Sequence, residues 1–172
     1  YAGKDGVEIG SGATGFVRKA AFSLRFGDIN PLVSANLRPD SKVLLERDVT
    51  SRLKAVAPFL AYDHDPYIVV RKDGKVQYIV DGYTTTRNFP NAQRADTGGL
   101  DPASGLYGRS FNYARNSVKA VVDAYDGTVT LYVVDEGDPI IRAYEKAFPE
   151  LFASGTDIPT ELRKHFRYPE DL

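Results

Sequence analysis

Apolar and polar residues alternate in two stretches of this chain, each centred on an Asp-Gly pair. The first stretch covers residues 67–81, with Asp-Gly at 73–74, and the second covers residues 118–134, with Asp-Gly at 126–127. An Asp-Gly pair in a two-residue loop favours the primed turn whose twist matches that of paired antiparallel strands. We therefore predict two β-hairpins.

Two-residue loops would also fix which residues face each other. In the second hairpin Val122 would face Leu131, so that one face of the strand pair is wholly apolar and the other is mixed. In the first hairpin Pro66 would face Asp81. Two hairpins of the same chemistry predict an α+β fold: an antiparallel sheet of at least four strands, with helices packed on one face.

Three stretches carry apolar residues at helical spacing, at residues 14–26, 41–57 and 139–148. The second is either one helix or a pair in which the later helix starts near Asp48. The third has Asp138 in position to cap its first turn. We expect these helices to cover the sheet.

Residues 84–108 show no periodicity and contain several glycines and prolines. A loop of this length inside a compact domain is uncommon and is usually a functional cover or a mobile excursion. The sequence does not decide between the two.

Length and charge narrow the class of protein. A chain of 172 residues predicts one domain, 1–172, with a core large enough to fold without metals or disulfides. Its 22 basic and 23 acidic residues give no reason to expect a nucleic-acid partner. The absence of cysteine excludes thiol catalysis, and no apolar run reaches the roughly 20 residues of a membrane helix. We expect a soluble segment of a longer protein.

An acidic cluster precedes the first hairpin. Asp63, His64 and Asp65 are consecutive, and the predicted register brings Asp81 beside them. Carboxylates with one imidazole can hold a divalent cation, yet Asp-His-Asp-Pro is also typical of a turn before a strand. Tyr83 belongs to a group of tyrosines that either pack across strands or stack on a sugar or peptide. The candidate ligand-binding residues are therefore Asp63, Asp65, Asp81 and Tyr83, with no catalytic residue, metal or cofactor assigned.

The run from Gly10 to Gly15 has the spacing G-x-G-x-x-G of a dinucleotide-binding loop. That fold needs a second parallel strand after the helix, and the sequence shows more helix there instead. We interpret the run as a glycine-rich helix start.

Several long, ordered motifs resemble one family of proteins. They lie at residues 53–63 (LKAVAPFLAYD), 79–85 (IVDGYTT), 112–119 (NYARNSVK) and 167–172 (RYPEDL). They resemble the large bacterial membrane proteins of uncharacterised protein family 0182. The resemblance implies a parent protein with several amino-terminal membrane-spanning helices and a large soluble part outside the membrane, to which this segment would belong. It implies no activity and no site residues.

Two functions follow as main hypotheses, beside a third in which the segment assists assembly or transport through the membrane part of the parent protein and has no ligand of its own. The first is a non-enzymatic binding or interaction domain at the cell membrane, on the extracytoplasmic side. Its partner would be the remainder of the parent chain, an envelope ligand or another protein. The second is a metal- or carboxylate-dependent hydrolase of the cell envelope that uses Asp63, His64, Asp65 and Asp81. The sequence leaves open whether the protein is an enzyme.

Overall fold

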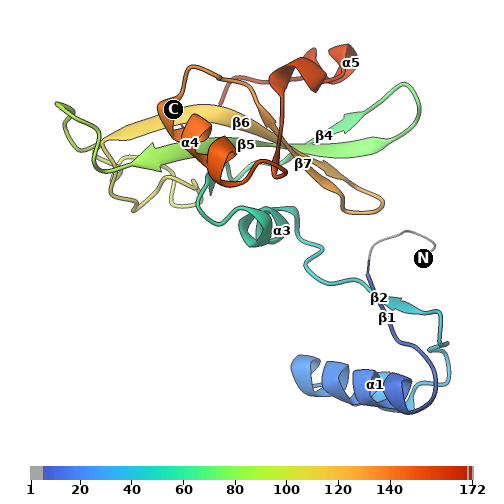
Figure 1. Cartoon of the computed structure of the whole chain (residues 1–172). Coiled ribbons are helices and arrows are strands. Elements are labelled where there is room, and N and C mark those ends of the chain that lie inside the picture. Colours follow the sequence, from blue (N-terminus) through green and yellow to red (C-terminus); the bar gives the residue numbers. More distant parts are fainter. Residues whose placement is uncertain (1–5, 170, 172) are drawn as a thin grey trace. The chain divides into compact units, whose positions relative to one another are not determined.

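The chain forms two compact units in the computed structural model, Tyr1–Arg47 and Asp48–Leu172 (Figure 1). The structure describes residues 6–169 and residue 171. Among these residues, no helix combines the length and apolar character required to cross a membrane. A single domain over the whole chain stays a prediction.

The amino-terminal unit is built on a helix and a short strand pair. Its elements are β1 (Val7–Glu8), α1 (Gly12–Phe26), α2 (Asn30–Val33) and β2 (Lys42–Val43). The predicted helix at 14–26 is confirmed as α1. The prediction of helix from residue 41 to 46 is wrong, because Lys42 and Val43 pair in antiparallel fashion with β1. Apolar residues at helical spacing do not reveal that Lys42 and Val43 pair with β1, which lies much earlier in the chain.

The carboxy-terminal unit contains a six-stranded sheet of order β3-β5-β6-β7-β8, with β4 pairing the first half of β5. Its strands are β3 (Ala61–Tyr62), β4 (Tyr67–Val70), β5 (Val76–Thr86), β6 (Tyr113–Asp123), β7 (Val129–Val133) and β8 (Phe152–Ala153). The pairs are antiparallel except β7 with β8. The predicted α+β class and antiparallel sheet are confirmed.

Both hairpin registers differ from the predicted ones, because each loop is longer than two residues. In the second hairpin Ala120 faces Leu131, and the amide of Asp123 donates to the carbonyl of Thr128. This shift of two residues leaves the apolar face unchanged. In the first hairpin Tyr67 faces Ile79, a shift of one residue, so Pro66 does not oppose Asp81. Both loops keep glycine in the left-handed region, as the turn chemistry predicts.

Helices cover both faces of the sheet, which corrects the prediction of one covered face. On β5 and β6, Val80 and Ala120 face a cluster that includes Leu53 of α3 (Val49–Val56) and Ile141 of α4 (Pro139–Ala147). The alternate residues point the other way and meet Ile158 and Leu162, the latter in α5 (Thr160–Arg163), just after the short helix η1 (Gly155–Asp157). Figure 1 shows α3 and α5 on opposite sides of the strands.

The long segment between β5 and β6 packs on the sheet as a cover. Leu106 and Phe111 are buried against Ala61 and Tyr83 in a third apolar cluster. This packing agrees with a cover, and a function for that cover stays a prediction. Residues 84–86, which the prediction placed in the loop, belong to β5.

Candidate functional site

A buried ion pair lies at the centre of the candidate site. Asp81 on β5 faces Lys119 on β6, and the two side chains form an ion pair with 5% of each exposed. The Lys119 ammonium also donates to the carbonyl of Arg167, 2.9 Å away. Burial raises the pKa of the Asp81 carboxyl, and the Lys119 charge opposes that effect. Each partner of this pair therefore depends on the other to offset its desolvation.

Asp63 follows β3 and joins the same cluster. Its backbone amide donates to the Asp81 carbonyl at 2.9 Å, and its Oδ2 accepts a hydrogen bond from the Tyr83 hydroxyl at 3.1 Å. Burial, followed by the charge of Asp63, raises the pKa of Tyr83. Tyr83 therefore stays protonated and acts as a hydrogen-bond donor, which fixes the orientation of the Asp63 carboxylate.

His64 and Asp171 extend the cluster toward the surface. His64 Nδ1 lies 3.3 Å from Asp63 Oδ1 and 3.8 Å from Asp171 Oδ1. One ligand atom from each of these three residues lies within 4.8 Å of the others. The structure thus brings together two carboxylates and one imidazole.

A cavity of about 10 Å³ borders this cluster, lined by Asp63, Asp65, Tyr67, Asp81, Arg167 and Tyr168. The Arg167 guanidinium lies 4.4 Å from the centre of the Tyr67 ring and closes one side. This volume suits one water molecule and excludes a sugar or a peptide.

The sequence-predicted residues are thus partly assembled. Asp63, Asp81 and Tyr83 are buried together, whereas Asp65 is exposed and borders the cavity. Ligand binding by this set stays a prediction. Sequence reasoning missed Lys119 and Asp171. Lys119 gave a signal, a charge within an apolar strand, but the pairing of β6 with β5 was needed to show that it faces Asp81.

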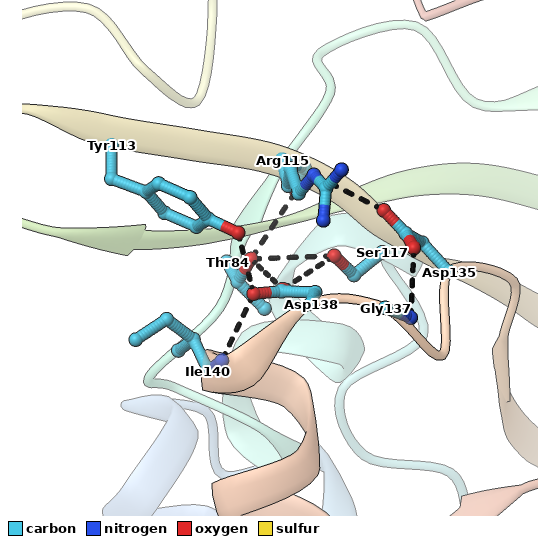
Figure 2. A network of polar contacts seen from close by, with 8 residues as sticks. All are labelled: Thr84, Tyr113, Arg115, Ser117, Asp135, Gly137, Asp138 and Ile140. Atoms are coloured by element: carbon cyan, nitrogen blue, oxygen red, sulfur yellow. Dashed lines mark hydrogen bonds and ion pairs between the residues drawn. The ribbon is translucent and has the colours of Figure 1, made fainter.

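A second polar network surrounds Asp138 at the start of α4 (Figure 2). Its carboxylate accepts hydrogen bonds from the hydroxyls of Thr84 and Ser117 at 2.5 Å each, and from Tyr113 at 2.8 Å. It also accepts from the backbone amide of Ile140 at 2.9 Å, which confirms the predicted helix cap. All these contacts are internal, so the network fixes α4 to β5 and β6.

The glycine run at 10–15 does not have a dinucleotide-binding context. Strand β1 pairs with an antiparallel strand, not a parallel one. A Cβ atom on Gly15 would lie 2.5 Å from the Gly10 carbonyl oxygen, so glycine there permits a close backbone contact. The interpretation as a glycine-rich helix start agrees with this geometry.

The profile of the Uncharacterised protein family (UPF0182) matches residues 1–172, the whole chain. The chain belongs to the UPF0182 family. Curated relatives in the family support the assignment: the chain is 43% identical to a UPF0182 protein of Methanospirillum hungatei, 47% to one of Rhodococcus jostii and 42% to one of Cupriavidus necator. Each comparison covers all of this chain and 17–18% of the relative's length. No solved structure matches the UPF0182 chain.

The UPF0182 chain also carries an apolar groove of about 770 Å³ at the ends of α3 and α4. It is lined by Val56, Pro58, Phe59, Ala147, Phe148, Pro149, Glu150 and Leu151. Phe148 is 45% exposed and stacks on Phe59, with ring centres 5.4 Å apart. This groove, unlike the cavity beside Asp63, has room for a peptide segment.

Proposed function

We propose that this chain is a non-enzymatic interaction domain of a membrane protein, on the extracytoplasmic side, and that its apolar groove holds an apolar segment of the same longer protein. The observation that carries the proposal is the groove, where Val56 and Phe148 remain substantially exposed within one continuous lining. Exposed apolar patches of this kind are typical of binding surfaces.

The length of the relatives supports a segment of the same polypeptide as the occupant of the groove. The chain spans less than a fifth of each relative, so most of such a protein lies outside this sequence. A segment linked in the same polypeptide meets the groove at a high effective concentration, which favours it over a separate partner. Glu150 is the one charged residue among the lining residues described, so the occupant is predominantly apolar.

The polar cluster supports a non-enzymatic role. Asp81 is paired with Lys119, Tyr83 is a structural donor, and the adjoining cavity holds only about one water. Substrate-sized space is therefore found at the apolar groove and not beside the candidate acids and bases. No specific observation favours the hydrolase.

Cysteine labelling in intact cells tests both parts of the proposal. This chain has no cysteine, so Phe148→Cys and Ile68→Cys in the longer protein each introduce one reporter into this region. Ile68 is 56% exposed on β4 and is the matched control for Phe148. With a membrane-impermeant maleimide, we expect Ile68→Cys to react in intact cells, and Phe148→Cys to react only after denaturation or when the 172-residue chain is produced alone.

Different results would contradict the extracytoplasmic location and the occupied groove. Labelling of Ile68→Cys only after cell lysis would contradict the extracytoplasmic location. Equal labelling rates at the two positions would show an empty groove. Loss of Phe148→Cys protection when the longer protein is purified would assign the groove to a separate molecule.

A further inference from the structure

Two buried carboxylates converge on one imidazole beside β3. The side chains of Asp63 and Asp171 are each 5% exposed, and His64 between them is 33% exposed. The two aspartates come from opposite ends of the carboxy-terminal unit, because Asp63 follows β3 and Asp171 lies beyond α5. Local turn chemistry therefore does not explain why these two carboxylates lie close together.

The negative charge of this cluster exceeds its positive charge. Asp63, Asp81 and Asp171 all act on the hydroxyl of Tyr83, so they share one small region. Two positive groups lie beside these three carboxylates: Lys119, which pairs with Asp81, and Arg167, which lines the adjoining cavity. Within residues 6–169 and 171, the part of the chain that the structure describes, Asp171 Oδ2 is buried and has no hydrogen-bond partner. Burying a carboxylate oxygen without a hydrogen-bond partner costs free energy unless a cation lies beside it.

We propose that Asp63, His64 and Asp171 bind one divalent cation of the zinc and manganese class. A ligand set of two carboxylates and an imidazole suits these ions better than calcium or magnesium, which prefer oxygen alone. Ligand atoms about 2.0–2.2 Å from one ion lie roughly 3–4 Å from each other. The observed separations of 3.3 Å and 3.8 Å from His64 to the two carboxylates fall in that range, and all three ligand atoms lie within 4.8 Å of one another.

The surroundings of Asp63 suit a metal ligand. The Tyr83 hydroxyl bonds Oδ2, and the backbone amide of Asp65 donates to Oδ1 at 3.3 Å. Such outer hydrogen bonds hold a ligating carboxylate in one orientation. The neighbouring cavity, which Asp63 also lines, has room for one water molecule. The bound ion would link residues 63–64 to residue 171.

Calorimetric titration of the 172-residue chain with zinc chloride, manganese chloride and calcium chloride tests the site. We expect one equivalent to bind, zinc more tightly than manganese, and both more tightly than calcium. His64→Gln and Asp171→Asn should each weaken zinc binding at least about tenfold. His64 is the safest position to change, because its side chain is partly exposed and its replacement leaves the core intact.

Two matched variants separate this site from its neighbours. Asp65→Asn tests the acidic run in the sequence, and His165→Gln tests the second of the two histidines. Both should bind zinc within about threefold of the unchanged chain, and zinc should shift the NMR signals of the His64 ring and leave those of His165 in place. Equal weakening by Asp65→Asn, a loss of binding in His165→Gln, or unchanged binding in His64→Gln and Asp171→Asn would each overturn the proposal.

Discussion

Asp138 shows how one side chain can hold several elements together. Burial acts to raise the pKa of its carboxyl, but the hydrogen bonds from Ser117, Thr84, Ile140 and Tyr113 together outweigh burial and lower the pKa. Its folded-state pKa is therefore below the unfolded value of about 3.9. The carboxylate contributes stability above about pH 4, and that contribution is lost as the pH falls through the lowered folded-state pKa.

Replacing Asp138 is predicted to lower the free energy of unfolding by an amount that depends on pH. Asp138→Asn keeps the size of the side chain but removes the charge, and should lower the free energy of unfolding at pH 7 by about 1.5–3 kcal/mol. The deficit should shrink at pH 3, measured by urea unfolding at both pH values. Glu136→Gln, an exposed change two residues away, should stay within about 0.5 kcal/mol. A deficit that is equal at both pH values would contradict the role of the charge.

The sequence predicted contacts between residues that lie close together along the chain. The capping bond from Asp138 to the amide two residues ahead could be predicted, because it needs only neighbouring chain. Its bond to Thr84 crosses 54 residues, and no local pattern encodes that contact. The approach of Asp171 to His64 was hidden for the same reason.

Among the elements, the segment between β5 and β6 is held unusually close to the sheet. A Cβ atom built on Gly105 would lie 1.8 Å from the carbonyl oxygen of Tyr62 on β3. Backbone atoms form that contact, so no side-chain rotation can relieve it. On Gly99, in the same segment, a Cβ atom would meet nothing within 4 Å.

This pair of glycines gives a matched test of the packed cover. Gly105→Ala should lower the free energy of unfolding by more than about 2 kcal/mol, because the segment must lift away from β3 and expose Leu106. Gly99→Ala should change it by no more than about 0.5 kcal/mol. Thermal and urea unfolding of both variants measure the difference. Similar values for the two would mean that the segment is not packed on β3 in solution.

Element types were easier to predict than their boundaries and pairings. Alternation identified the strands, and Asp-Gly identified where both hairpins turn, because these signals are local. The loop lengths were wrong since Asp-Gly also suits three- and four-residue turns, in which glycine adopts the same left-handed conformation. The strand at Lys42 was missed because it forms only through its pairing with β1.

At the scale of the whole molecule, the two units differ in how much apolar side-chain surface they bury. Strands β5 and β6 of the carboxy-terminal unit are covered on both faces, with Ile79, Val80 and Ala120 fully buried. In the amino-terminal unit, the buried residues of α1 are Gly15 and Ser23. Phe16 and Leu24 on the same helix are 65% and 87% exposed. The apolar burial that stabilises folded structure is thus concentrated in one unit.

Hydrogen exchange should reveal this difference directly. Opening of α1 exposes little new apolar surface, whereas opening of β5 and β6 disrupts the main core, so the two require different free energies. We expect the amides of α1 to exchange at least about 100-fold faster than those at the centres of β5 and β6, followed by mass spectrometry on the 172-residue chain. The exposed segment at 91–94 is the fast reference. If α1 were as protected as β6, the apolar side chains of α1 would have to be covered in solution, by another part of the chain or by a second copy.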